Sequence, residues 1–264
     1  MKIAAVQPKL NPAMNKSERI KKIGELIEEA ENCDLIVLPE LWNVGFFSFD
    51  KYGEKSETLE GKTVKSMSVR AQELDCHLLM GSIVEAGEES KLYNTSILLD
   101  NRGNILTAYR KIHLFGYKSR EADILSPGRE INVEDIGAGT VALSTCYDLR
   151  FPELYRIQLD LGAEYMLVVS AWPRERVDHW QLLCQTRALE NQSYLIAANC
   201  AGRSGSVELA GKSLIISPRG EILSEAGRGE EIIKADCPRD EVIIFRDNFP
   251  AVADRVYSCV NQEE

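Results

Sequence analysis

The chain of 264 residues carries a net charge of −10, and 44% of its residues are hydrophobic. A globular chain of this size buries enough apolar surface to fold without disulfides or a structural metal. Its negative charge argues against binding to nucleic acid or to an anionic membrane surface, because both of those partners favour a basic surface.

Seven cysteines are spread along the chain, and none belongs to a Cys-x-x-Cys pair. This spacing gives no support for a zinc ribbon or a thioredoxin-type redox motif. The N-terminal segment MKIAAVQPKL enters a strand-like run at once, so we expect no secretory signal peptide. No window approaches the roughly 18 apolar residues of a membrane span. We therefore expect a cytoplasmic protein with reduced cysteines.

The N-terminal half alternates between strand and helix patterns. Residues 3–6 form an apolar strand, and Ser17 occupies an N-cap position before apolar residues at helical spacing. The continuous apolar run that stops at Pro39 predicts a strand buried on both faces. A second helix is predicted over 63–74. The segments HLLMGSIVE and KLYNTSILLDNRGNILTAYRKIHLF then predict three strands, of which the last two are joined by a hairpin turn at 101–104.

The C-terminal half continues the same alternation. A strand is predicted over 141–145, a helix over 153–161, a strand in YMLVVSAWP, a helix over 177–191 and a strand in SYLIAANCAG. A second hairpin turn is predicted at 218–220. Strands alternating with helices, with internal hairpins, predict an α/β fold with a mixed sheet covered by helices. No Pro/Gly/Ser-rich linker divides residues 1–264, so we predict a single domain.

Cys146 lies where a strand pattern changes to a helix pattern, in VALSTCYDLRFPELYR. Such a turn lies at the carboxyl end of a sheet, where ligands gather in α/β folds. Backbone N–H groups at the start of a helix favour a thiolate and can hold an oxyanion. Position alone leaves two interpretations open, a nucleophile and an inert buried thiol.

The histidines offer little support for a Cys–His pair. The chain has three, His77, His113 and His179, and they are too far apart in the sequence to indicate a metal site. A cysteine hydrolase or protease that uses His113 or His179 as its base remains an alternative.

Two charged residues at strand ends are candidate partners for the thiol. Glu40 ends the buried strand LIVLPE beside Trp42, and partial burial makes a carboxylate a better general base. Lys111 ends a strand in TAYRKIHLF, where it could donate to a developing oxyanion. A solvated strand-end glutamate and a surface lysine are the structural alternatives.

Three segments, VLPELWNVGF, YRKIHLF and CYDLRFPELYR, together resemble the signature segments of the nitrilase, or carbon–nitrogen hydrolase, superfamily. Similarity continues in AWPRERVDHWQLLCQTRALENQSYLIAANCAG. The resemblance implies a four-layer αββα sandwich and a catalytic triad of Glu40, Lys111 and Cys146, with no cofactor and no metal. The family's second glutamate, which precedes a Pro-Gly pair, corresponds to Glu121 in SREADILSPG.

The resemblance also implies a mechanism. Glu40 takes the proton of Cys146, whose thiolate attacks an amide carbon, while Lys111 and the backbone N–H of Tyr147 hold the oxyanion. Glu40 then protonates the leaving nitrogen and activates water against the thioester. Glu121 holds Lys111 or the substrate. The sequence departs from many relatives at Ser144-Thr145, just before the cysteine, and we expect this to change packing and not chemistry.

Substrate preference is predicted from finer similarities. CYDLRFPE and AWP most resemble the branch that hydrolyses ω-amides of 2-oxo dicarboxylic acids, such as 2-oxoglutaramate and 2-oxosuccinamate. A substrate carboxylate favours an arginine in the pocket. Arg174 is the candidate, and a solvent-exposed loop arginine is the alternative. We expect Arg150 to form an ion pair with Asp148 or Glu153. The residues expected to line the pocket are Trp42, Phe46, Tyr147 and Trp172.

Other functions stay open at this point. Within the superfamily these are an aliphatic amidase, an N-carbamoyl amino acid amidohydrolase and a nitrilase; a transferase that uses the same thioester is a further possibility. From another class comes a non-catalytic member that binds small molecules. Relatives commonly pair as dimers, and the segment DNFPAVADRVYSCV resembles tails that take part in such contacts. We therefore expect a homodimer.

Overall fold

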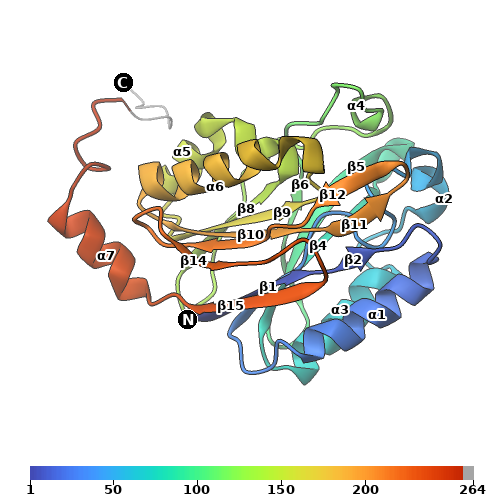
Figure 1. The fold of residues 1–264 in the computed structure, drawn as a ribbon, viewed down its shortest axis with the longest axis horizontal. Coiled ribbons are helices and arrows are strands. Elements are labelled where there is room, and N and C mark those ends of the chain that lie inside the picture. The colour runs from blue at the N-terminus through green and yellow to red at the C-terminus, as the bar shows by residue number, and fades with distance from the viewer. Residues whose placement is uncertain (258–264) are drawn as a thin grey trace.

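The computed structural model describes residues 1–257, and two six-stranded sheets form its centre (Figure 1). In the first sheet, a parallel group formed by β1, β3 and β4 is flanked by antiparallel strands. Its order is β15 (Glu231–Asp236), β1 (Lys2–Gln7), β3 (Leu35–Val37), β4 (His77–Ala86), β5 (Leu92–Leu99) and β6 (Ile105–Arg110). The hairpin predicted at 101–104 joins β5 to β6.

The second sheet has the same mixed design, with β8, β9 and β10 parallel at its centre. Its order is β14 (Ile222–Glu225), β13 (Leu214–Ile216), β10 (Tyr194–Asn199), β9 (Tyr165–Ser170), β8 (Thr140–Thr145) and β7 (Val133–Asp135). The second predicted hairpin joins β13 to β14. A small third sheet contains β12 (Val207–Ala210), β11 (Ala201–Ser204) and β2 (Lys9–Leu10).

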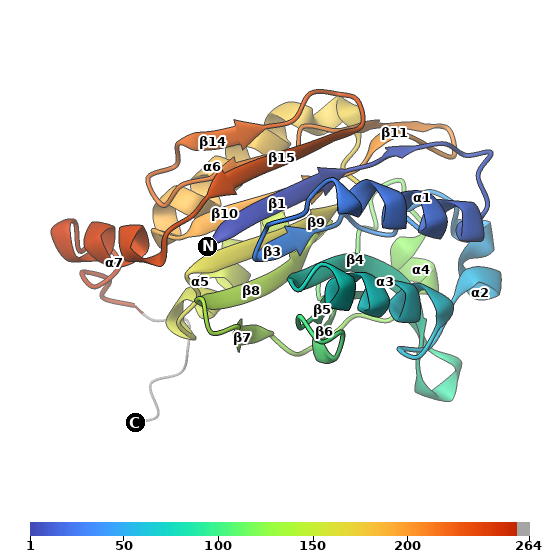
Figure 2. The ribbon, with the colours of Figure 1, turned by 90° about the horizontal axis from the view of Figure 1, so that it is seen from below.

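The two large sheets pack face to face, and helices cover their outer faces (Figures 1 and 2). Alternate residues of each strand explain this: Ile3 and Ala5 of β1 and Val141 and Leu143 of β8 belong to one apolar cluster between the sheets. Helices α1 (Lys16–Glu28) and α3 (Lys62–Glu73) cover the first sheet, and α5 (Pro152–Asp160) and α6 (Val177–Asn191) cover the second. The four-layer αββα sandwich is confirmed.

Three further helices lie outside these layers. The short helices α2 (Tyr52–Lys55) and α4 (Glu121–Ile124) belong to loops, and α7 (Arg239–Asn248) extends from one end of the sandwich (Figure 1). Residues 258–264, which include Cys259 and the end of the DNFPAVADRVYSCV segment, lie outside the described residues. The other six cysteines are buried and unpaired.

The first helix begins two residues earlier than expected. Its N-cap is Asn15 and not Ser17, because the Asn15 side chain accepts from the backbone N–H of Glu18 at 3.1 Å. The Glu18 carboxylate in turn accepts from the backbone N–H of Asn15 at 2.8 Å. This reciprocal capping box satisfies two N–H groups that the helix cannot pair internally.

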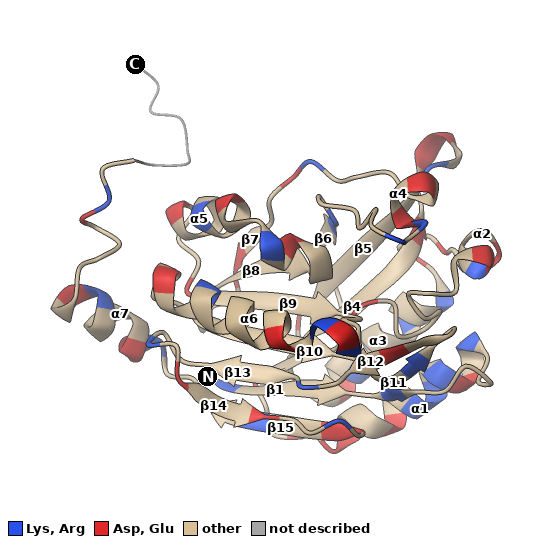
Figure 3. Cartoon of the chain, turned by 45° about the horizontal axis from the view of Figure 1, so that its top comes forward, with Lys and Arg blue, Asp and Glu red and all other residues tan. Residues whose placement is uncertain are grey.

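Charged residues lie mainly on the outer helices and loops, with acidic and basic side chains interspersed (Figure 3). The parallel strands β8, β9 and β10 carry none. No helix within residues 1–257 is both long enough and apolar enough to cross a membrane.

Candidate active site

Three polar side chains converge beyond the ends of strands from both sheets. Glu40 follows β3, Lys111 follows β6 directly, and Cys146 follows β8 directly. Glu40 and Lys111 are completely buried, as is Glu121 at the start of α4. Facing sheets thus bring residues that are far apart in the sequence into one buried site.

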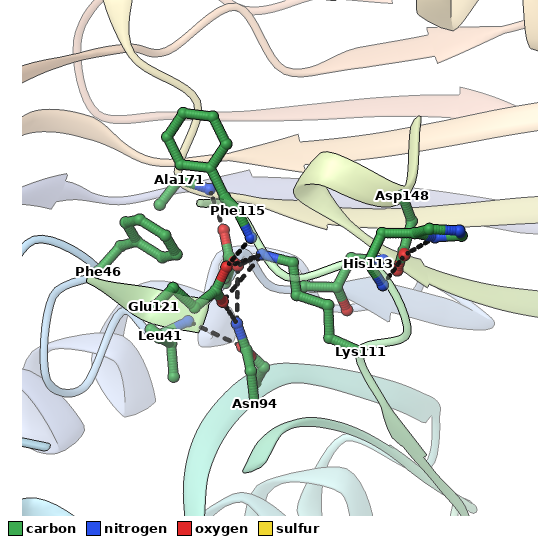
Figure 4. Close-up of polar contacts among 12 residues, drawn as sticks. Leu41, Phe46, Asn94, Lys111, His113, Phe115, Glu121, Asp148 and Ala171 are labelled. Carbon is green, nitrogen blue, oxygen red and sulfur yellow. Dashed lines mark hydrogen bonds and ion pairs between the residues drawn. The ribbon is translucent and has the colours of Figure 1, made fainter. Parts of the chain in front are cut away.

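Lys111 lies between two carboxylates (Figure 4). Its Nζ is 3.0 Å from Glu40 Oε1 and 2.9 Å from both carboxylate oxygens of Glu121. Asn94 of β5 bridges the same two acids, because its Nδ2 donates to Glu40 Oε1 at 2.8 Å and to Glu121 Oε1 at 3.0 Å. The ammonium and the amide together fix both carboxylates.

A backbone group also holds one oxygen of each carboxylate (Figure 4). The N–H of Ala171 donates to Glu40 Oε2 at 2.9 Å, and the N–H of Phe115 donates to Glu121 Oε2 at 2.7 Å. Hydrogen bonds to an ionised carboxylate are stronger than those between neutral groups. The loops that carry Ala171 and Phe115 are therefore tied to the two acids.

The electrostatics favour a protonated thiol beside a charged lysine. Burial opposes the charge of Lys111, but Glu121 and Glu40 outweigh it and raise the pKa of the ammonium above its ordinary value. Burial also raises the pKa of Glu121, against the attraction of Lys111. The pKa of Cys146 is raised by burial and by the charge of Glu40. A base is therefore needed to remove the thiol proton.

The turn that carries Cys146 is held in an uncommon backbone conformation. Cys146 has a φ of +50°, in the left-handed region that side chains other than glycine seldom adopt. Asp148 stabilises the turn, because its Oδ2 accepts from the backbone N–H of Thr145 at 2.9 Å and from the hydroxyl of Tyr109 at 2.7 Å. Strain of this kind persists only where the surroundings impose it, and it is concentrated at functional sites.

A small pocket opens onto Cys146. Half of its ten lining residues are aromatic, and two arginines supply its charge. It is lined by Phe46, Phe47, Phe115, Cys146, Tyr147, Arg150, Ala171, Trp172, Pro173 and Arg176.

The two arginines pack over aromatic rings of the pocket. The guanidinium carbon of Arg150 lies 4.8 Å from the ring centroid of Trp172, and that of Arg176 lies 5.4 Å from that of Phe115. Neither arginine forms an ion pair with a carboxylate among residues 1–257. The pKa of Arg150 is lowered, first by burial and then by the charge of Arg176. Two unneutralised cations therefore face a small pocket that contains a thiol.

A sequence profile described as carbon–nitrogen hydrolase matches residues 2–247. The chain belongs to the carbon–nitrogen hydrolase family. As a member of it, the protein is an enzyme that hydrolyses carbon–nitrogen bonds of amides.

Curated relatives and a solved structure match this carbon–nitrogen hydrolase over nearly its whole length. It is 36% identical to the 2-oxoglutaramate amidase of Paenarthrobacter nicotinovorans, over 96% of this chain and 88% of the relative. It is also 36% identical to the 2-oxoglutaramate amidase of Bacillus subtilis, over 90% and 91%. The crystal structure of Saccharomyces cerevisiae Nit3, a member of branch 10 of the nitrilase superfamily, superposes with a TM-score of 0.89 at 33% identity, covering 97% of each chain.

Two residues expected in the pocket of the hydrolase lie elsewhere. Trp42 is completely buried in the core, where its indole N–H donates to the carbonyl of Met80 at 2.9 Å. Arg174 points to the surface, with 46% of its side chain exposed and Nη1 2.6 Å from Glu208 Oε1. Phe46, Tyr147 and Trp172 do line the pocket.

Arg150 also differs from the expectation. It forms no ion pair with Asp148 or Glu153, because Asp148 is engaged in holding the turn and the guanidinium extends over Trp172. Sequence reasoning missed Arg176, which lies on the same short turn as Arg174, and Asn94. A polar residue at the centre of an apolar strand pattern, as in LYNTSILL, was the available signal for Asn94.

The departure at Ser144-Thr145 serves packing in the hydrolase. Ser144 Oγ lies 2.8 Å from the hydroxyl of Tyr155, and Thr145 Oγ1 lies 2.8 Å from Ser96 Oγ. These contacts link β8 to α5 on one side and to β5 on the other.

No histidine forms a hydrogen bond with Cys146 within the described residues. His113 stacks on Phe151, with ring centroids 3.7 Å apart, and its Nδ1 is 2.8 Å from Asp148 Oδ1. His179 Nδ1 is 3.4 Å from Arg150 Nη2. His77 begins β4. Both histidines that were candidate bases therefore have other partners.

We predict that His113→Ala keeps the chemistry of the hydrolase. The substitution removes one of several contacts of Asp148, so kcat should fall by no more than about tenfold. Steady-state ammonia release measures it, with circular dichroism as the check on folding. A loss of several thousandfold in a folded variant would restore the cysteine–histidine alternative.

Proposed function

We propose that this hydrolase is an ω-amidase that removes the terminal amide of short 2-oxo dicarboxylic acid monoamides, such as 2-oxoglutaramate and 2-oxosuccinamate. The observation that carries the proposal is the pairing of Cys146 with Arg150 and Arg176 in the lining of one pocket. Such a pocket accommodates a small molecule with an amide at one end and an anionic group at the other.

The arginines favour a carboxylate at the far end of the substrate. A planar guanidinium binds a carboxylate through two parallel hydrogen bonds, which a neutral amide cannot reproduce. Both guanidinium groups lack an ion-pair partner among residues 1–257, and the positive charge of each disfavours that of the other. An incoming carboxylate relieves this repulsion. The names of the relatives from Paenarthrobacter nicotinovorans and Bacillus subtilis support the same substrate class.

In the first half of the proposed reaction Glu40 takes the thiol proton of Cys146 and the sulfur attacks the amide carbon. Charge develops on the amide oxygen, where Lys111 Nζ and the backbone N–H of Tyr147 donate. Each such donor lowers a barrier by about 3 kcal/mol. The carbon–nitrogen bond then breaks, Glu40 returns its proton to the nitrogen, and ammonia leaves a thioester on Cys146.

In the second half Glu40 removes a proton from a water molecule that attacks the thioester. The carbon–sulfur bond breaks, the thiolate takes the proton back from Glu40, and the carboxylic acid product departs. Glu121 holds Lys111 in place from the other side, at 2.9 Å from each oxygen. These steps require neither a metal nor a cofactor.

The arginine pair gives the test of this proposal. We expect the double variant Arg150→Met/Arg176→Met to lower kcat/KM for 2-oxoglutaramate by roughly 100-fold, because it removes charge-assisted hydrogen bonds to the carboxylate. Hydrolysis of butyramide, which carries no charge, should change by less than about threefold. Coupled assays of ammonia release measure both.

Arg174→Met is the matched control, because Arg174 lies two positions from Arg176 and binds Glu208 at the surface. It should leave both substrates unaffected. Equal losses for the charged and the neutral amide in the double variant would contradict a carboxylate site. A wild-type preference for butyramide would instead favour an aliphatic amidase, and preferences for N-carbamoyl amino acids or nitriles would favour those branches.

The proposal includes the setting in which the enzyme acts. Residues 1–257 pack as one sandwich. We propose that residues 1–264 form one carbon–nitrogen hydrolase domain that acts in the cytoplasm, with no nucleic-acid or membrane partner.

We propose that the enzyme forms a homodimer. Leu182 and Leu189 of α6 support this, since 66% and 52% of these side chains are exposed on an outer helix. Light scattering of the purified protein tests it.

A further inference from the structure

Ser170 lies beside the turn that carries Cys146. It is the last residue of β9, which runs parallel to β8, and Val169 pairs with Thr145 in their register. Ser170 and Cys146 each come one residue further along their strands. Side chains alternate along a strand, and Val168 packs on the same side of the sheet as Cys146, whereas Val169 packs between the sheets. The alternation therefore directs Ser170 to the side of Cys146.

The Ser170 hydroxyl is completely buried and has no hydrogen-bond partner within the described chain. Other buried serines nearby are satisfied. Ser144 Oγ lies 2.8 Å from the Tyr155 hydroxyl and donates to the carbonyl of Leu167 at 3.1 Å, and Ser213 Oγ donates to Gln7 Oε1 at 2.9 Å. A buried polar group without a partner destabilises the folded protein. The group that responds to this hydroxyl is the sulfur of Cys146, whose pKa it lowers.

We infer that Ser170 is a further catalytic residue, whose hydroxyl donates a hydrogen bond to the sulfur of Cys146 when that sulfur becomes negatively charged. This inference rests on the proposed role of Cys146 as the nucleophile. Ser170 keeps its proton throughout, because Glu40 receives the proton of the thiol. A neutral thiol is a weak acceptor, and a thiolate is a strong one.

The same hydroxyl acts twice in one reaction cycle. Charge is present on the sulfur as it attacks the amide, and again as the carbon–sulfur bond of the thioester breaks. A hydrogen bond that is much stronger in these charged states lowers the barrier without strengthening the binding of substrate. Loss of the Ser170 hydroxyl should therefore lower kcat and leave KM unchanged.

The electrostatic surroundings of Cys146 support this role. Burial and Glu40 raise the pKa of the thiol, whereas Lys111 and the Ser170 hydroxyl lower it. Lys111 is already held by two carboxylates, but the Ser170 hydroxyl has no competing acceptor. The titratable and charged groups that interact with this sulfur are Glu40, Tyr52, Lys111, Glu121, Arg150 and Cys200.

The test compares Ser170→Ala with Ser144→Ala, which removes an equally buried hydroxyl from the neighbouring strand. For Ser170→Ala we expect kcat on 2-oxoglutaramate to fall roughly 10- to 100-fold, with KM changed by less than about twofold. The rate at which iodoacetamide alkylates Cys146 at pH 8, measured from the mass of the peptide, should fall about tenfold. Ser144→Ala should change each quantity by less than about threefold. Thermal unfolding verifies that both variants are folded.

Two results would overturn the inference. One is a folded Ser170→Ala protein that is alkylated and turns over within twofold of the wild type. The other is an equal loss in Ser144→Ala, which would indicate a packing effect. Failure of the wild type to hydrolyse 2-oxoglutaramate would refute the proposed substrate. Alkylation needs no amide substrate, so the comparison of the two serine variants by alkylation would still test the role of Ser170.

Discussion

Replacement of Cys146 by alanine is expected to lower kcat for amide hydrolysis by more than about 10⁴-fold. No thioester can form without the sulfur, and no other cysteine lines the pocket. The fold should survive, because alanine occupies less space than cysteine at a position where Asp148 holds the turn through backbone contacts. Ammonia release measures activity, and circular dichroism measures folding.

Cys184→Ala provides the control for this variant. Cys184 is completely buried on α6 and does not line the pocket. It should retain wild-type turnover. In the wild-type enzyme, rapid acid quenching during turnover should reveal the mass of an acyl group on the peptide that contains Cys146. A Cys146→Ala protein with wild-type turnover would refute the thioester mechanism.

The second large effect is expected for Lys111→Met, which removes the charge between two buried carboxylates. Glu40 and Glu121 would then share the amide of Asn94 without a counter-ion. Removing one partner of a buried ion pair lowers the free energy of unfolding by about 3–5 kcal/mol. Activity should fall by more than about 10³-fold, because the oxyanion also loses a donor.

The loss of stability in Lys111→Met should depend on pH. Burial already raises the pKa of Glu121 in the wild type, and without Lys111 that pKa rises further. The folded variant then binds a proton that the unfolded chain releases, so its stability decreases as pH rises. Urea unfolding at pH 5 and at pH 8 should show the smaller deficit relative to wild type at pH 5.

A double variant separates the two roles of Lys111. In Lys111→Met/Glu121→Gln one of the two acids is neutral, so the repulsion disappears and much of the lost stability should return. Activity should not return, because the oxyanion still lacks the ammonium. If the double variant recovered activity as well, Lys111 would act only by neutralising its neighbours.

Much of the site could be predicted because its main residues stand at strand ends. Glu40, Lys111 and Cys146 each follow a predicted strand, and ligands gather at the carboxyl ends of strands in α/β folds. The helix over 177–191 was predicted with the bounds that the structure has, since its limits are set locally. The signature segments then joined three separate residues into one site.

The arginines could not be assigned because their surroundings are not local in sequence. Arg174 and Arg176 share one short turn, yet the first binds Glu208 of β12 and the second packs on Phe115 from a loop before α4. Arg150 has acidic neighbours in the sequence, but the turn around it directs the guanidinium to Trp172. Strand β15 was also not predicted, because it is defined by its pairing with β1, which is distant in the sequence. Helix α7 was not predicted either.

The pairing of β15 with β1 has a consequence for biosynthesis. Lys2 lies opposite Asp236, and Gln7 lies opposite Glu231, so β1 is synthesised long before the strand with which it pairs. Until then one edge of β1 is unpaired, and an unpaired edge strand invites association with other chains. Contacts between such distant segments also slow folding. The first sheet is therefore completed only after residues 231–236 have been synthesised, and nascent chains that end before residue 231 are those that most need chaperone protection.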